Sequence, residues 1–100
     1  MSREDIITQL QSNDIRSIFE ELGIEHVYLV GSYARNEQTD VSDIDLLYTR
    51  KAWKRIGWLY FMRKKLELEQ KLWKKIDLVN ERYIYQDIKP YLESDKLLVY

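Results

Sequence analysis

The segment GSYARNEQTDVSDIDLL, residues 31–47, carries the two features that decide the fold of this chain. The pair Gly31 and Ser32 ends a short apolar run, and ten residues separate Ser32 from the first of two acids, Asp43 and Asp45. These acids stand in a run that alternates polar with apolar residues. Because side chains on a strand alternate between its faces, both carboxylates are expected on one face, with their apolar neighbours in the core.

Paired carboxylates of this kind repel each other unless a cation lies between them. Carboxylate oxygens, phosphate oxygens and water are the ligands that Mg²⁺ prefers. Gly31 lets the backbone approach a ligand closely, and Ser32 offers a hydroxyl and an N–H at a strand-to-helix turn, where phosphates are often held. We therefore expect two halves of one nucleoside triphosphate site, with the turn at the β- and γ-phosphates and the acids holding metal at the α-phosphate.

A third acid, Asp77, interrupts a short apolar strand, where a carboxylate is costly unless it has a role or a partner. A two-metal site needs such a group, because one metal must also activate the attacking oxygen. A structural salt bridge from Asp77 to Lys74 or Lys75 is the competing interpretation.

The apolar spacing around these motifs predicts a small mixed α/β (α+β) domain, a mixed sheet with helices packed on it, over residues 1–100. The expected elements are a helix after Ser2 reaching residue 22 with a possible break at 12–14, strands at 26–30 and 43–48, a helix at 52–74, a strand at 75–79, a helical segment at 82–93 with a boundary near Lys89, and a strand at 96–100.

Two apolar stripes are predicted on the helix at 52–74, and together they are wider than one core contact requires. The first comprises Ile56, Leu59, Met62, Leu66 and Trp73. The second comprises Trp58, Phe61, Leu68 and Leu72, which are either further core residues or a partner interface.

Composition restricts the class of protein. The 100 residues are 45% apolar and 33% charged, with one His, no Cys and a net charge of −1. Disulfides and thiolate metal sites are excluded, and a soluble cytoplasmic domain without a membrane-spanning helix is expected. The charge is uneven: −7 over residues 1–49, +8 over 50–75 and −2 over 76–100. The basic run is usually a solvated helix face, although it could also attract ATP or contact RNA bound by a partner.

The motifs resemble the nucleotidyltransferase signature of the DNA polymerase beta superfamily, which has Gly-Ser, then Asp-x-Asp, then a third Asp on a later strand. The fuller form GSYAR…SDIDLL is similar to the minimal nucleotidyltransferases (MNT), the antitoxins of HEPN/MNT toxin–antitoxin systems. Asn36 is a departure, because the family usually has Gly after the Arg. Asn tolerates left-handed backbone, so we expect the turn to be kept.

The resemblance implies a polymerase-beta-type fold and a role for each motif residue. Asp43 and Asp45 would ligate Mg²⁺, and Asp77 would ligate the second of two ions or act as general base. Gly31 and Ser32 would hold the triphosphate. Arg35 would support the triphosphate or the loop, unless it is an ordinary surface arginine. The reaction implied is in-line attack of a hydroxyl on the α-phosphate of ATP, with pyrophosphate leaving.

The acceptor is expected to come from a partner, because only 23 residues follow Asp77 and larger relatives use a second domain to bind it. Minimal nucleotidyltransferases pair with HEPN RNase toxins, and characterised members transfer AMP from ATP to a toxin tyrosine. The resemblance thus implies an antitoxin whose partners are a HEPN toxin and ATP, with no membrane, no direct nucleic-acid binding and homo-oligomerisation left open. The alternatives are an inactive module that blocks its partner by occlusion, and a transferase acting on a small molecule with a helper subunit.

Overall fold

A four-stranded mixed sheet with the strand order β3-β2-β1-β4 organises the computed structural model, which describes residues 1–100. Strands β1 (Ile24–Val30) and β2 (Ile44–Arg50) are antiparallel, and β3 (Ile76–Asn80) runs parallel to β2. The short strand β4 (Leu97–Leu98) pairs antiparallel with the other edge of β1. The predicted α/β class with a mixed sheet is therefore confirmed.

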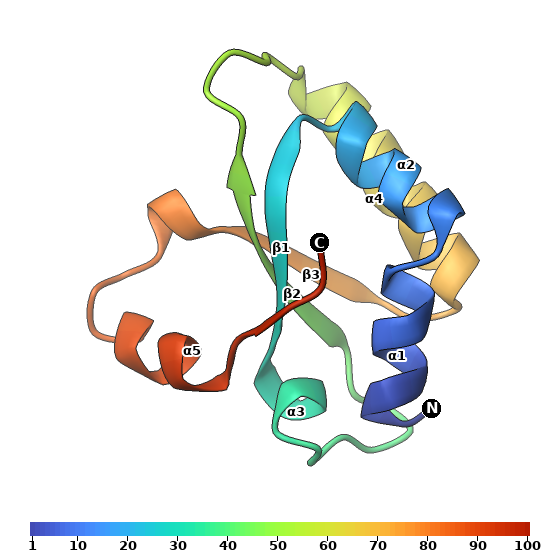
Figure 1. The fold of residues 1–100 in the computed structure, drawn as a ribbon, viewed down its shortest axis with the longest axis vertical. Helices are drawn as coiled ribbons and strands as arrows, with labels where there is room; N and C mark the ends of the chain where they lie inside the picture. Colours follow the sequence, from blue (N-terminus) through green and yellow to red (C-terminus); the bar gives the residue numbers. More distant parts are fainter.

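Five α-helices and one 3₁₀ helix surround this sheet (Figure 1). Helices α1 (Arg3–Leu10), α2 (Asn13–Glu21) and α4 (Trp58–Leu72) lie together on one side. The single-turn α3 (Gly31–Ala34) follows β1 directly, and α5 (Lys89–Asp95) lies apart from the three-helix group, beyond the 3₁₀ helix η1 (Glu81–Tyr83). None of these helices is long and apolar enough to cross a bilayer.

The hydrophobic core lies between the sheet and the three-helix group. Alternate residues of β1 and β2 enter it with side chains from α1, α2 and α4, and every fully buried side chain is apolar or aromatic. The core includes Ile6, Leu10, Ile18, Phe19, Val27, Leu29, Ile44, Leu46, Leu68, Leu72 and Ile76. Because strand side chains alternate, the residues between them, including Asp45 and Asp77, belong to the opposite face of the sheet.

Several predicted boundaries are confirmed. Ser2 caps α1 in a reciprocal capping box, in which Ser2 Oγ accepts from the Asp5 backbone N–H and Asp5 Oδ2 accepts from the Ser2 N–H, each at 3.0 Å. A break separates α1 from α2, at residues 11–12 rather than 12–14, and α5 begins at the predicted boundary, Lys89. The predicted helical segment at 82–93 is wrong over residues 84–88, which form a loop and turn between η1 and α5.

The predicted helix at 52–74 is too long at its start. Helix α4 begins at Trp58, and Lys51 and Lys54 form a turn before it, with the Lys54 N–H donating to the Lys51 carbonyl at 3.3 Å. Gly57 has extended backbone at the N-cap position, and glycine is better tolerated there than in the interior of a helix. Four of the ten basic residues of 50–75 therefore lie before the helix rather than on it.

The second apolar stripe of α4 contributes mainly to the core rather than to an open surface. Leu68 and Leu72 are buried at 0% and 1% exposure, and Phe61 packs against the core; only Trp58, at 74%, is open to solvent. The exposed side instead carries residues of the first stripe, namely Leu59, Met62, Leu66 and Trp73. Packing of α4 against α2 and β3 selects the buried face, and periodicity alone does not distinguish two adjacent apolar stripes.

Candidate functional site

The acids Asp45 and Asp77 lie opposite each other on neighbouring strands. They are Cα partners in the parallel register of β2 and β3, so both side chains project from the face of the sheet that α1, α2 and α4 leave uncovered. Asp43 is exposed and directly precedes β2. The fold thus brings the three predicted acids to the same end of the sheet, where β2 and β3 begin. Their roles as metal ligands remain predictions.

The glycine-serine turn meets this acid pair at the end of β1. Val30 is the register partner of Asp45, and Gly31 follows it with φ +75°, a left-handed conformation that favours glycine. A Cβ at position 31 would collide with the Asp45 carboxylate. The half-buried Ser32 comes next, and its carbonyl accepts from the Glu37 N–H at 2.8 Å, which holds the loop after α3.

The electrostatics of the site favour a cation. Partial burial raises the pKa of Asp45 above its usual range, and the nearby charges of Asp77 and Asp43 raise it further, whereas Arg35 lowers it. No group of three or more His, Cys, Asp or Glu side chains in the chain is arranged to hold a metal ion alone. Mg²⁺ does not require such a cage, because it usually takes one or two carboxylates with substrate phosphates and water. The donor set of facing carboxylates therefore fits this ion.

The competing interpretation of Asp77 as half of a salt bridge is wrong. No Lys or Arg nitrogen lies within 4.0 Å of its carboxylate among the ion pairs of the chain. Lys74 Nζ instead donates to the carbonyl of Asp40 at 3.0 Å, and Lys75 makes no ion pair. Asp77 is an exposed acid without an ion-pair partner on β3, an edge strand of the sheet.

Arg35 connects the turn to α5. Its guanidinium donates to Asp95 Oδ2 at 2.8 Å and lies 3.4 Å from Glu37 Oε2. Asn36 follows with φ +60°, which confirms that asparagine adopts the left-handed backbone at this position. Sequence reasoning did not identify Asp95, because it is 60 residues from Arg35 and no local pattern links them.

A cavity of about 400 Å³ opens over the acid pair. Gly31, Asp45 and Asp77 line it from the ends of the strands, and the segment after β3 supplies a mostly apolar wall, comprising Tyr83, Ile84, Tyr85, Ile88 and Leu92. Sequence reasoning missed this wall. The available signal was a cluster of large apolar residues directly after an acid-bearing strand, without the spacing of a core helix. An apolar wall facing paired acids suits a ligand with one flat apolar part and one anionic part.

Comparison with known proteins agrees with this geometry. A family model described as "Polymerase beta, Nucleotidyltransferase" matches residues 13–99. The chain is 40% identical over 76 residues to the putative protein adenylyltransferase MJ0435 of Methanocaldococcus jannaschii, covering 76% of this chain and 74% of the relative. It is 31% identical over 85 residues to the putative protein adenylyltransferase MJ0126 of the same organism, covering 84% and 85%.

Solved structures share the fold. A structure described as a putative minimal nucleotidyltransferase superposes with a TM-score of 0.76 at 27% identity, over 97% of this chain and 95% of the other. A tri-AMPylated HEPN toxin of Shewanella oneidensis in complex with its MNT antitoxin matches with a TM-score of 0.63 at 19% identity, over 92% and 71%. The family match covers most of the chain, and the residues that it spans include the Gly-Ser turn and all three acids: the chain belongs to the polymerase beta nucleotidyltransferase family.

Proposed function

We propose that this chain transfers AMP from ATP to a hydroxyl group, preferably of a tyrosine, on a partner protein of the HEPN class, and that it thereby acts as the antitoxin of a toxin–antitoxin pair in the cytoplasm. The observation that carries the proposal is the pairing of Asp45 with Asp77 across β2 and β3, directly against Gly31 and beneath a cavity with an apolar wall. This arrangement offers separate places for a metal-bound triphosphate and for a nucleobase.

Each part of the site has a role in the proposal. Asp43 and Asp45 hold Mg²⁺ at the α-phosphate, and Gly31 and Ser32 receive the β- and γ-phosphates at the start of α3. The apolar wall contacts the base. Bound Mg²⁺ supplies charge neutralisation of the phosphates and lowers the pKa of the attacking hydroxyl.

The reaction is a substitution at phosphorus. The acceptor oxygen forms a bond with the α-phosphorus while the bond from that phosphorus to the bridging oxygen breaks, and pyrophosphate leaves. Asp77, exposed and without a cationic partner, accepts the hydroxyl proton or holds the second metal ion. Positioning and charge stabilisation by these fixed groups supply most of the rate enhancement.

Support for a protein acceptor comes from the relatives. Two relatives at 40% and 31% identity are named as putative protein adenylyltransferases, and structural neighbours include a toxin–antitoxin complex with AMP-PNP and an AMPylated toxin with its antitoxin. AMP-PNP is an ATP analogue, which agrees with ATP as the substrate.

The experiment incubates the chain with the HEPN protein encoded beside it, Mg²⁺ and ATP labelled on the α-phosphate. We expect label on the partner, none from ATP labelled on the γ-phosphate, and loss of transfer when Mg²⁺ is chelated. Asp45→Asn should abolish labelling. Asp40→Asn is the matched control, because it makes the same charge change in an exposed loop and should keep full transfer.

Two outcomes would contradict the proposal. An unlabelled partner that is nevertheless neutralised, by wild type and by Asp45→Asn alike, would identify an inactive module that acts by occlusion. Label on a small molecule in the absence of any protein acceptor would identify a different substrate class.

A further inference from the structure

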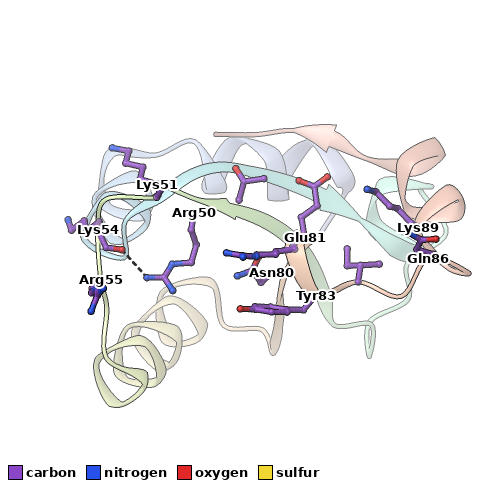
Figure 2. Close-up of a pocket in the computed structure, with 13 residues that line it drawn as sticks. Arg50, Lys51, Lys54, Arg55, Asn80, Glu81, Tyr83, Gln86 and Lys89 are labelled. Carbon is purple, nitrogen blue, oxygen red and sulfur yellow. Dashed lines mark hydrogen bonds between the residues drawn. The ribbon is translucent and has the colours of Figure 1, made fainter.

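A second cavity, of about 610 Å³, lies at the opposite ends of β2 and β3 from the acid pair (Figure 2). It begins at Thr49, four residues beyond Asp45 along β2, a distance of about 13 Å on a strand. Its lining comes from the end of β2 and the following loop, from the end of β3 with η1, and from Gln86 and Lys89. In Figure 2 the loop side chains Lys51, Lys54 and Arg55 stand at one end of it, and Gln86 and Lys89 at the other.

Positive charge dominates this cavity. Six of its lining residues are basic, namely Arg50, Lys51, Lys54, Arg55, Arg82 and Lys89, and a single one is acidic, Glu81. The Glu81 carboxylate is already directed at Lys96, whose Nζ lies 3.6 Å away. None of the six basic side chains takes part in an ion pair of the chain. In a chain of net charge −1, an uncompensated cluster of this size is a local concentration of positive potential.

Main-chain contacts fix the loop without cancelling its charge. Arg50 donates from its guanidinium to the Lys54 carbonyl at 3.1 Å, and Lys54 Nζ donates to the carbonyl of Glu20 at 3.1 Å. Carbonyl groups hold the side chains in place but leave the net charge intact. An anionic ligand would therefore relieve the repulsion among these cations.

Aromatic surfaces accompany the charge. Tyr83, 74% exposed, lines the cavity, and Trp53, 76% exposed, stands in the same basic loop with Lys51 Nζ 5.7 Å from its ring centroid. Cationic grooves that combine Arg and Lys with open aromatic rings are typical of sites for single-stranded nucleic acid, in which phosphates pair with the cations and bases stack on the rings. An acidic peptide would pair with the basic side chains, but its carboxylates would not stack on the aromatic rings.

We propose that this basic cavity is a binding site for single-stranded nucleic acid, at the far ends of β2 and β3 from the acid pair, with Tyr83 and Ile84 shared between its lining and the wall of the acid-pair cavity. A concave site of this volume accommodates about one or two unstacked nucleotides rather than a duplex, whose grooves are read by a protruding element. The amides of Asn80 and Gln86 provide hydrogen-bonding groups for base edges or sugar. This inference departs from the expectation of no direct nucleic-acid binding that accompanied the family resemblance.

The test measures fluorescence anisotropy of labelled eight-nucleotide RNA and DNA strands with the full chain, without ATP or Mg²⁺. We expect binding at 50 mM salt that weakens steeply at 200 mM. The double variant Arg55→Gln/Arg82→Gln should weaken binding roughly tenfold and flatten the plot of log affinity against log salt by about 1.4, which is two single-strand phosphate contacts. The matched control Arg63→Gln/Lys65→Gln removes the same charge from α4, outside the cavity, and should retain affinity.

A second pair of variants tests the stacking. Tyr83→Ala should weaken binding by roughly fivefold to a hundredfold, and Tyr83→Phe should not, because the ring is kept. Tyr91→Ala, exposed on α5 and outside the cavity, is the control. Circular dichroism confirms that each variant is folded.

Four results would overturn the inference. Three of them are the absence of binding at 50 mM salt, equal losses in the cavity variants and their α4 or α5 controls, and displacement of the strand by poly-glutamate with Tyr83→Ala unaffected. The last result would identify the cavity as a site for an acidic protein segment. Equal affinity for duplex and single strands would likewise contradict it. None of these measurements depends on AMP transfer, so they test the nucleic-acid site independently of the catalytic proposal.

Discussion

Gly31 and Asp45 occupy adjoining space where β1 ends and β2 begins, such that a side chain at position 31 would overlap the Asp45 carboxylate. Position 31 therefore requires glycine for two separate reasons. The backbone of Gly31 is left-handed, with φ +75°, and its Cα surface is covered by the acid. Gly31 belongs to the turn that is expected to hold phosphates, and Asp45 belongs to the strand that is expected to hold metal. The two halves of the site can approach this closely because position 31 has no Cβ.

Gly31→Ala should destabilise the chain and abolish transfer. The left-handed conformation alone costs about 1–2 kcal/mol for a residue with a Cβ, and displacement of the Asp45 carboxylate adds to it. Thermal unfolding and the labelled-ATP assay give the two readouts.

The matched control for that variant is Gly23→Ala. Gly23 has a similar φ of +68°, but a Cβ there would meet only the aliphatic part of Lys54, far along the chain from the acids. It should lose comparable stability and keep transfer. Loss of transfer in both variants would mean that strain, rather than the contact with Asp45, explains the result.

Asp45→Asn should stabilise the metal-free chain while abolishing transfer. Folding raises the pKa of Asp45 above its usual value of 3.8, so the folded state binds this proton more tightly than the unfolded state does. The stability contribution of Asp45 is therefore lost as pH rises through the interval between 3.8 and the folded pKa, and the cost stays constant above that interval. The Asn variant avoids this cost at neutral pH and loses its advantage in acid.

Unfolding midpoints in chelator at pH 7 and at pH 3 check this pH dependence. A gain of 1 kcal/mol corresponds to roughly 4–8 °C in a domain of this size. Asp40→Asn, in the exposed loop, should show no gain at either pH. Addition of Mg²⁺ and ATP should raise the midpoint of the wild type and not that of Asp45→Asn, and an equal rise in both would contradict metal binding at Asp45.

The parts of the site that were predictable from the sequence are those fixed by short-range rules. The two-residue period of a strand places Asp45 on the face opposite the core, although Asp43 lies just before β2 rather than on it, and the tolerance of asparagine for left-handed backbone anticipates the conformation of Asn36. Asp77 was identifiable because a carboxylate inside an apolar strand is costly unless it has a partner or a function. Its register opposite Asp45 depends on pairing between β2 and β3, whose partner residues are 32 positions apart in the chain, and no local pattern encodes this pairing.

The features that escaped prediction depend on long-range packing. Apolar residues cover about half of α4, so the sequence permits two buried faces, and contacts with α2 and β3 choose between them. The apolar wall over the acid pair comes from a segment with only a single 3₁₀ turn before α5, where neither helical nor strand periodicity applies. The ion pair of Arg35 with Asp95 forms only after α5 lies beside α3.

A comparison of two leucines tests the orientation of α4. Leu68→Ala removes a side chain with 0% exposure and should cost about 2–5 kcal/mol, whereas Leu66→Ala, two residues earlier and 55% exposed, should change stability by less than about 0.5 kcal/mol. Urea unfolding of both variants, with an unchanged dependence on denaturant, provides the measurement. Similar losses at both positions would mean that α4 is rotated relative to this structure.

Trp73→Gly should stabilise the chain, because the end of α4 holds a bulky residue in a conformation suited to glycine. Trp73 follows the last helical residue with φ +56° and ψ +31°, and its side chain is 91% exposed, so its removal sacrifices little packing. Relief of the left-handed strain, about 1–2 kcal/mol, exceeds the 0.5–1 kcal/mol that glycine loses through the greater freedom of the unfolded chain. The net gain should be at most about 1.5 kcal/mol, measured by urea unfolding followed with circular dichroism. Trp73→Ala separates the two causes, since alanine removes the indole but keeps the Cβ and should give no gain; equal stabilisation by both substitutions would attribute the effect to the exposed ring instead of the backbone.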